Sequence, residues 1–246
     1  MLFRSTGTSN VLCSGGNTGS LSVAGSGGTG TISYLWTPGS IQGPTASNLT
    51  AGNYNVTITD ANNCTTSTSL SISQPTPLQA NLQVVSQVSC NGGNNGRAHI
   101  TGLAGGTPGY NINWSPYGGT DTAASSLSAG NYLVTISDAN GCTTSASTII
   151  NQPAPITSTI TTNPAFCGGS TGSASVNASG GISPYNYLWN FNNNTLGSIT
   201  GLTAGSYNVT ITDANGCTIQ STAFVSGSPS ITASAITNNK IGRAHV

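Results

Sequence analysis

Six cysteines are the residues of this 246-residue chain whose type and spacing most directly suggest chemistry. One set recurs every 77 residues: Cys13, Cys90 and Cys167. A second set recurs after 78 and then 75 residues: Cys64, Cys142 and Cys217. Thiols in such a pattern form disulfides, bind zinc or stay reduced in a core, and we favour disulfides because the chain has no Cys-x-x-Cys ligand pair. The other two states stay open at this point.

The remaining residues able to do chemistry are four acidic side chains and two histidines. Asp60, Asp138 and Asp213 recur at one turn position in three separate units, so we interpret them as turn-forming residues. Only Asp121 shares a unit with another acid, and His99 aligns with serines on the polar side of a strand. General acid–base catalysis needs convergent groups, so we expect no enzyme and no cofactor. A Ca²⁺ site is a weaker alternative, because calcium prefers clustered oxygen ligands.

The composition excludes several classes of protein. Charged residues make up 3% of the chain and the net charge is zero, against about 25% charged residues in an average domain. Four Lys and Arg residues are too few to neutralise a nucleic-acid backbone, and no apolar run is long enough to span a bilayer. The polarity comes from Ser, Thr, Asn and Gly, and Glu is absent. This composition predicts an all-β extracellular chain.

Internal repetition divides the chain into three units of about 77 residues. Each unit carries one tryptophan, 28 residues before its second cysteine: Trp36, Trp114 and Trp189. A segment that ends on the second cysteine is nearly identical in all three units, at residues 51–64, 129–142 and 204–217. Shorter runs of alternating aromatic and polar residues precede it. Several short strands separated by turns indicate a small β-sandwich.

The nearly identical segment predicts a β-hairpin. Tyr54, Val56 and Ile58 alternate with polar residues, as in a strand with one buried face. Asp-Ala-Asn-Gly then predicts a turn, because aspartate accepts hydrogen bonds from turn backbone and glycine tolerates positive φ, at Gly141 and Gly216. We expect the tryptophans to form the core together with the first tyrosine of each hairpin: Tyr54, Tyr132 and Tyr207.

The simplest pairing of the cysteines joins the two within each unit: Cys13–Cys64, Cys90–Cys142 and Cys167–Cys217. Six cysteines permit 15 pairings, and repetition favours this one because each unit then closes on its own. Closing a loop of about 50 residues would contribute on the order of 4 kcal/mol, which is comparable with the net stability of a small domain. We therefore expect an oxidising, secreted location.

Prolines at 74–77 and 152–155 mark the unit boundaries. The two termini match translations of a common short-read sequencing adapter, and residues 231–238 resemble the start of the third unit. The expected organisation is an adapter remnant, a first repeat truncated at its N-terminus, two further repeats, the first strand of a truncated fourth, and a second adapter remnant: residues 1–5, 6–77, 78–155, 156–230, 231–239 and 240–246. We thus expect a window on a longer array, with no information about a signal peptide.

Two motifs resemble the SprB repeat, a module found in tandem in large surface adhesins of gliding bacteria. The first is Gly-Gly-x-x-Pro-Tyr-x-Tyr-x-Trp, best kept at residues 180–189. The second is Leu-x-Ala-Gly-x-Tyr-x-Val-Thr-Ile-x-Asp-Ala-Asn-Gly-Cys-Thr, present at 202–218, 127–143 and, with Asn63 for glycine, 49–65. The resemblance implies an Ig-like fold, export by type IX secretion, and a role in adhesion or gliding at the cell surface, associated with the outer membrane. One departure is that each hairpin tyrosine precedes its cysteine by ten residues, whereas the tyrosine of an immunoglobulin domain precedes it by two.

The predicted fold is therefore all-β, with three tandem Ig-like β-sandwich repeats in a linear array. The first functional hypothesis is a non-catalytic spacer or adhesive stalk of a secreted surface adhesin, whose repeats contact their neighbours in the chain and whose ligands are surface glycans or solid surfaces. The alternative is a carbohydrate-binding or accessory array of an exported enzyme, in which exposed aromatic side chains stack on sugars. The position of the aromatic residues, including Tyr117, distinguishes the two.

Overall fold

The computed structural model describes residues 2–228, 233 and 234, and in this part of the chain every regular element is a β-strand. The chain divides into two compact units, Met1–Gln87 with Asn94–Asn151 and Val88–Gly93 with Gln152–Val246. The expected fourth-repeat strand at 231–239 and the adapter remnant at 240–246 lie outside the described residues, apart from 233 and 234. The all-β expectation is confirmed.

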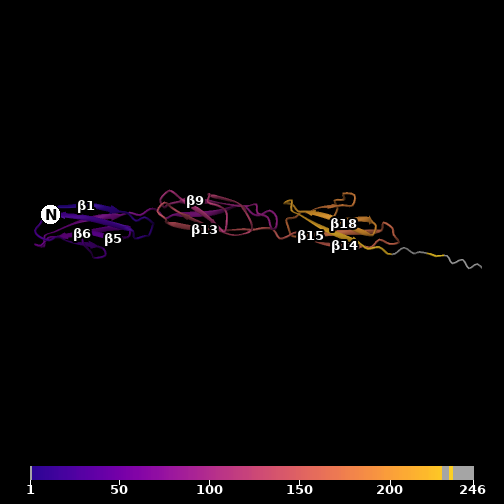
Figure 1. The fold of residues 1–246 in the computed structure, drawn as a ribbon, viewed down its shortest axis with the longest axis horizontal. Coiled ribbons are helices and arrows are strands. Elements are labelled where there is room, and N and C mark those ends of the chain that lie inside the picture. The colour runs from indigo at the N-terminus through magenta and orange to yellow at the C-terminus, as the bar shows by residue number, and fades with distance from the viewer. Residues whose placement is uncertain (1, 229–232, 235–246) are drawn as a thin grey trace, which may run out of the picture. The chain divides into compact units, whose positions relative to one another are not determined.

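Repeat 1 is a sandwich of two antiparallel sheets (Figure 1). One sheet has the order β1-β2-β5, with bounds Leu2–Ser9, Gly19–Ser26 and Thr45–Leu49. The facing sheet has the order β4-β3-β6-β7, with bounds Ile41–Gln42, Ser33–Thr37, Gly52–Thr59 and Thr65–Ile72. The expected hairpin is β6–β7, whose register runs from Gly52↔Ile72 to Thr59↔Thr65 without a break.

Repeats 2 and 3 have the same strand order without the short β4. In repeat 2 the sheets are β8-β9-β11 and β10-β12-β13, with bounds Gln79–Ser86, Gly96–Ala104, Ala123–Leu127, Asn111–Ser115, Gly130–Ser137 and Thr143–Ile150. In repeat 3 they are β14-β15-β17 and β16-β18-β19, with bounds Thr157–Asn163, Gly172–Ser179, Ser198–Leu202, Asn186–Trp189, Gly205–Thr212 and Thr218–Val225. Three copies of one Ig-like sandwich therefore follow each other along the chain.

The core of each repeat lies between its two sheets, where the alternating residues of the strands meet. Tyr54, Val56 and Ile58 of β6 are buried, while the residues between them are partly exposed. The tryptophan of each repeat is buried and donates its indole N–H, at 2.9 Å, to a carbonyl seven residues further on: Trp36 to Gly43, Trp114 to Asp121 and Trp189 to Leu196. Burial of the large ring is thus combined with a partner for its one polar atom.

The first tyrosine of each hairpin closes a tyrosine corner. Its hydroxyl donates to the carbonyl of the residue four positions earlier, at 3.0–3.1 Å: Tyr54 to Thr50, Tyr132 to Ser128 and Tyr207 to Thr203. Tyr54 and Tyr132 are buried, and Tyr207 is half-buried with its ring edge-on to Phe191. The corner is the one found in immunoglobulin domains. Its ten-residue distance from the cysteine arises because that cysteine lies beyond the strand, in the next turn.

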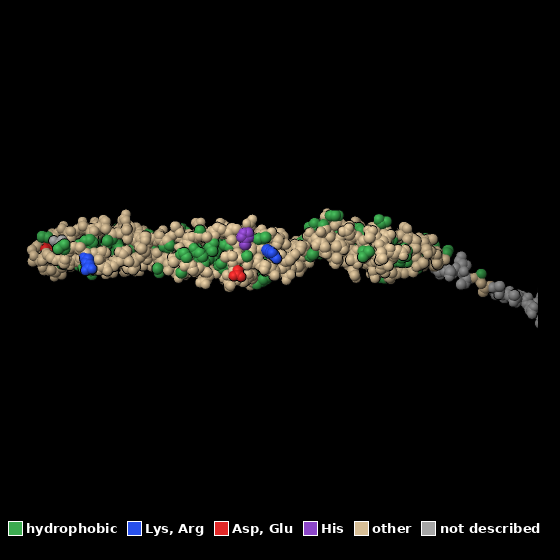
Figure 2. Space-filling view, turned by 90° about the horizontal axis from the view of Figure 1, so that it is seen from above, with side chains coloured by type: hydrophobic (Ala, Val, Ile, Leu, Met, Phe, Trp, Pro, Cys, Tyr) green, Lys and Arg blue, Asp and Glu red, His purple; other side chains and the backbone are tan. Residues whose placement is uncertain are grey.

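The surface is mostly uncharged, and Figure 2 shows only isolated Lys, Arg, Asp and His side chains on the visible face. Strand residues that point outward are largely Ser, Thr and Asn, as in β7 with the sequence TTSTSLSI. Hydroxyl and amide groups therefore supply most of the hydration of the sheets. None of the described elements is a helix that could cross a membrane.

Candidate functional site: the junctions between repeats

The two disulfides of the described chain join consecutive repeats. Cys13 of repeat 1 is bonded to Cys142 of repeat 2, and Cys90 of repeat 2 is bonded to Cys217 of repeat 3. The expected pairing within each repeat is therefore wrong. The first cysteine of one repeat binds the second cysteine of the following repeat, and Cys64 and Cys167 carry free, exposed thiols.

Pairing within repeat 1 fails because its two cysteines lie at opposite ends of the sandwich. The loop that carries Cys13 is held against the end of β7, where Val11 N–H donates to Ser73 O at 3.0 Å. Cys64 immediately precedes the start of β7. An eight-residue strand spans about 26 Å, whereas a disulfide needs Cα atoms about 4.4–6.8 Å apart.

Repeat 3 separates its cysteines in the same way. Ala165 N–H donates to Ser226 O at 2.8 Å, and Cys167 N–H donates to Ser228 Oγ at 3.0 Å, just beyond the end of β19. Cys217 immediately precedes β19. The predicted Cys167–Cys217 bond is thus excluded, because the length of β19 separates the two cysteines.

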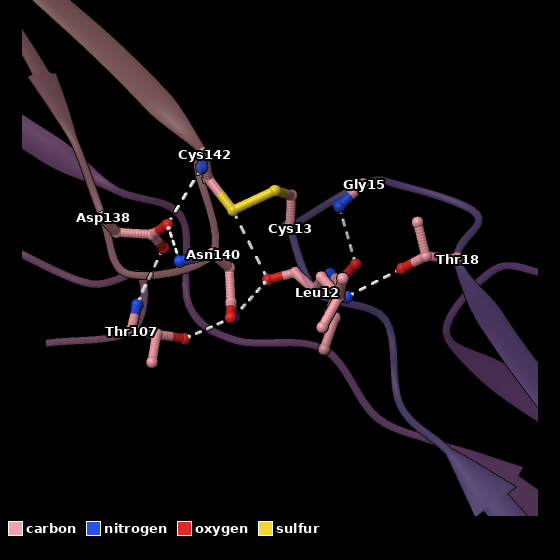
Figure 3. The surroundings of a disulfide bond; sticks show 9 residues. Leu12, Cys13, Gly15, Thr18, Thr107, Asp138, Asn140 and Cys142 are labelled. Carbon is pink, nitrogen blue, oxygen red and sulfur yellow. Dashed lines mark hydrogen bonds between the residues drawn. A yellow bond between two sulfur atoms is a disulfide. The ribbon is translucent and has the colours of Figure 1, made fainter.

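A buried aspartate builds the turn that presents the second cysteine (Figure 3). One carboxylate oxygen of Asp138 accepts the backbone N–H groups of Asn140 and Cys142, both at 2.9 Å. The other oxygen accepts Thr107 N–H at 2.8 Å. The carboxylate therefore fixes the hairpin turn and ties it to the loop that precedes β10. Asp60 and Asp213 do the same in their repeats.

The backbone donors keep these carboxylates ionised. The Thr29 N–H and then the Cys64 N–H lower the pKa of Asp60 below its ordinary value of 3.8. At Asp138 the Thr107 N–H is the largest cause of a lowered pKa. At Asp213 burial is the largest influence and acts to raise the pKa, but the backbone donors together lower it. Both oxygens of each carboxylate are occupied by the backbone, which suits a structural role rather than proton transfer.

The asparagine of the turn contacts the preceding repeat beside the disulfide. Asn140 Nδ2 donates to Leu12 O at 3.2 Å and to Thr107 Oγ1 at 2.9 Å (Figure 3). At the other junction, Asn215 Nδ2 donates to Ser89 O at 2.9 Å. In both cases the acceptor belongs to the residue just before the bonded cysteine. Each junction therefore combines one covalent bond with one hydrogen bond in a repeated geometry.

Sequence reasoning missed the role of the Gly-Gly pair in the motif. Gly105 lies at φ +79°, and a Cβ there would come within 1.9 Å of Pro77 O. Gly180 is equivalent, since a Cβ on it would lie 2.0 Å from Pro155 O. The glycines thus allow the proline linker to pack directly against the backbone of the loop. The signal was present in the sequence, because both the Gly-Gly pair and the linker proline recur, but nothing in their spacing showed that they touch.

The turn that carries Cys64 has the same structure although its thiol is free. One oxygen of Asp60 accepts the N–H groups of Asn62 and Cys64, both at 2.9 Å. Asn63 occupies the position of the glycine at φ +63°. Repeat 1 therefore presents the cysteine in the geometry that the other two repeats use for bonding.

The other side chains that could take part in chemistry or binding are dispersed or buried. Within the described residues, no group of three or more His, Cys, Asp or Glu side chains lies close enough to hold a metal ion. Tyr117 is 46% exposed, but its oxygen accepts Ser128 N–H at 3.2 Å and its ring packs edge-on to Tyr132 at 5.4 Å. Phe166 and Phe224 of repeat 3 are also exposed. Because the tryptophans are buried and none of these three exposed rings recurs as an exposed aromatic residue in the other repeats, the position of the aromatic residues favours the spacer hypothesis over stacking on sugars.

The comparison with protein families agrees with this organisation. The family model described as "SprB repeat" matches the chain three times, at residues 5–41, 82–119 and 159–194. No curated protein sequence matches the chain.

Among solved structures, the chain is similar to the three N-terminal domains of the Highly Immunogenic Outer Capsid protein of bacteriophage RB49, with 15% identity, a TM-score of 0.38, and coverage of 92% of this chain and 98% of that one. It is also similar to the N-terminal eight Ig domains of Down Syndrome Cell Adhesion Molecule, with 15% identity and a TM-score of 0.38, covering 93% of this chain and 37% of that one.

Proposed function

Because this chain carries three SprB repeats, we propose that it is a non-catalytic stalk segment of a large cell-surface adhesin. The observation that carries the proposal is the disulfide from each repeat to the next. Catalysis or sugar binding requires each domain to be stable on its own, but it does not require covalent bonds between domains. A segment that transmits tension does require such bonds, because without them it would lengthen at its junctions.

The disulfides limit how far the chain can be drawn out. The loops that they close, 13–142 and 90–217, overlap along the sequence. Under tension the shortest covalent path runs to Cys13, crosses to Cys142, returns along the chain to Cys90 and crosses to Cys217. Even fully unfolded, the oxidised chain would therefore be shorter by about 150 residues, or ~530 Å at about 3.5 Å per residue, than the reduced chain.

Disulfides at partly exposed junctions also support an extracellular location, since disulfides persist in oxidising compartments. The resemblance to SprB repeats extends this proposal to export by type IX secretion, association with the outer membrane, and attachment or gliding on a surface. The repeats would act there as a spacer, with the ligand bound by another part of the adhesin.

Single-molecule pulling between the chain termini tests the stalk. We expect the final contour length to increase by ~530 Å when a reductant is added. The double variant Cys64→Ser/Cys167→Ser is the matched control, because it removes only the free thiols and should show the same increase. An equal contour length with and without reductant would contradict the proposal.

A glycan array with the oxidised chain tests the alternative function. We expect no binding that depends on Tyr117, an exposed aromatic residue with a hydroxyl that has no counterpart in the other repeats. Specific glycan binding that is lost in Tyr117→Ala would instead favour a carbohydrate-binding array.

A further inference from the structure

We propose that Cys64 and Cys167 are the two open ends of a disulfide ladder, each able to bond another repeat of the same kind. Cys64 would take the first cysteine of one such repeat, and Cys167 the second cysteine of another. The inference rests on the proposed stalk function and extends it, because it names the partner of each end. It also requires that the two free thiols differ in which cysteine they select.

The first support is that both equivalents of Cys64 are bonded to a cysteine of another repeat. Cys142 and Cys217 hold the same position in the turn, and each is joined to the first cysteine of the preceding repeat. The hydrogen bonds from Asp60 to Asn62 and Cys64 match those in the other two turns at 2.9 Å. The Cys64 turn is thus already formed before any partner arrives.

The second support is the side chain of Asn62. Its equivalents, Asn140 and Asn215, donate to the carbonyl of the residue before the partner cysteine. Within the described residues, the Asn62 amide makes no such bond, although its backbone N–H is held by Asp60. Repeat 1 therefore has the same thiol and the same amide donor that bind the cysteine loop at the two bonded junctions. These groups identify a cysteine loop of another repeat as the partner of Cys64.

At the other end, Cys167 lies on the loop equivalent to those of Cys13 and Cys90. The backbone beside it is anchored like that of repeat 1: Ala165 N–H donates to Ser226 O as Val11 N–H donates to Ser73 O. The loop of repeat 3 is one residue shorter: Gly169 N–H donates to Phe166 O, where the other two loops use the carbonyl of the cysteine, and Cys167 adopts φ +55°. Its anchoring places the thiol at the end of the repeat that the first cysteine uses for bonding, so we assign it the second cysteine of another repeat.

Bond formation at either end is an ordinary thiol oxidation. Two thiols lose two protons and two electrons and form one S–S bond, while a disulfide oxidant such as oxidised glutathione gains them and becomes two thiols. No residue of the chain other than the two cysteines changes its covalent state.

The test mixes two full-length variants, Cys167→Ser with only Cys64 free and Cys64→Ser with only Cys167 free, at high protein concentration with oxidised glutathione. A second copy of the chain here supplies the neighbouring repeat, and the concentration replaces the short linker that would hold it nearby. Non-reducing electrophoresis and peptide mapping measure the products. We expect a several-fold excess of the Cys64–Cys167 heterodimer over either homodimer, whereas random pairing gives a twofold excess.

Asn62→Ala, placed in the Cys167→Ser chain, should lower the yield of heterodimer about fivefold at equilibrium, the value of one hydrogen bond. Asn53→Ala is the matched control, because Asn53 is an exposed asparagine on β6 of the same repeat and its loss should leave the yield unchanged. Intact mass of each variant verifies that the Cys13–Cys142 and Cys90–Cys217 bonds are present.

Dimers in random proportions, or no dimer at all, would overturn the ladder. Either result is distinguishable from failure of the stalk, since the increase in contour length on reduction depends only on the two bonds already closed. A normal increase in contour length without any heterodimer would support the stalk function and contradict the proposal for Cys64 and Cys167.

Discussion

The turn at residues 60–64 and the turn at residues 138–142 have the same backbone hydrogen bonds, yet only the second ends in a disulfide. They differ by one residue, Asn63 in place of Gly141, and both residues adopt positive φ. The comparison shows that the disulfide does not make the turn. The aspartate makes it, and the sulfur is then available for a neighbour.

Formation of the turn before the disulfide suits a protein built of repeats. If each turn needed its disulfide in order to form, the array would have to assemble all its junctions at once. Because the carboxylate fixes the turn locally, each repeat can fold first and be bonded afterwards.

Removing a closed bond should have the largest effect. We expect Cys13→Ser/Cys142→Ser to lower the free energy of unfolding of the segment it encloses by about 5 kcal/mol, since the bond closes a loop of 129 residues. Cys64→Ser, the same change in the unbonded turn, should stay within about 0.5 kcal/mol of the parent chain. Denaturant unfolding of both variants measures the difference, and equal losses would show that Cys64 has a structural role of its own.

Removing the carboxylate should have the next largest effect, and it should be greater in the unbonded turn. Asp60→Ala leaves the N–H groups of Thr29, Asn62 and Cys64 without their acceptor. Asp138→Ala does the same, but the disulfide still restrains Cys142. We expect a lower thermal midpoint for Asp60→Ala than for Asp138→Ala under oxidising conditions. The difference should vanish in reductant, and its persistence would argue against the role given to the bond.

The same carboxylates make stability depend on pH. Their pKa values in the folded chain lie below the ordinary 3.8, so the unfolded chain binds protons first as the pH falls. The stabilisation is complete above pH 3.8 and is lost as the pH falls from there through the folded pKa. Thermal midpoints measured from about pH 6 to pH 2 should decrease at the acid end. Asp60→Asn should flatten the decrease, and an unchanged profile would contradict the assignment.

The smallest effects should come from the residue at positive φ. Gly141→Ala meets no atom within 4 Å of its new Cβ, so its cost of about 1 kcal/mol is that of the left-handed conformation alone. Asn63→Gly should stabilise repeat 1 by no more than about 0.5 kcal/mol, because asparagine already tolerates this conformation. Denaturant midpoints would measure both. A larger loss at Gly141→Ala would mean that the turn shifts on substitution.

Local patterns in the sequence were sufficient to predict the hairpin, but not the strands β5, β11 and β17. Alternation at Tyr54, Val56 and Ile58 reports which face of β6 is buried, and the repeated Asp-Ala-Asn-Gly reports the turn. Both are properties of neighbouring residues, so a sequence contains them directly. The contact between Gly105 and Pro77 joins two loops that are distant in the sequence, which spacing alone does not reveal. The tyrosine corner is local, since it joins residues four positions apart, but alternation alone does not show where the hydroxyl group bonds.

The pairing of the cysteines could not be predicted from their spacing, because the same period fits bonds within repeats and bonds between repeats. What excludes the bond within a repeat is that its two cysteine loops lie at opposite ends of one strand, β7 in repeat 1 and β19 in repeat 3. That separation belongs to the fold, and the spacing of the cysteines does not contain it.

The overlap of the two disulfide loops has a consequence for a protein exposed to proteases. A cut anywhere between Cys13 and Cys90 falls inside the loop 13–142, and a cut between Cys142 and Cys217 falls inside the loop 90–217. Between Cys90 and Cys142 both loops enclose it. A single cleavage at any peptide bond from residue 13 to residue 217 thus leaves one covalently connected molecule, so a nicked chain would still hold together whatever is attached to its two ends.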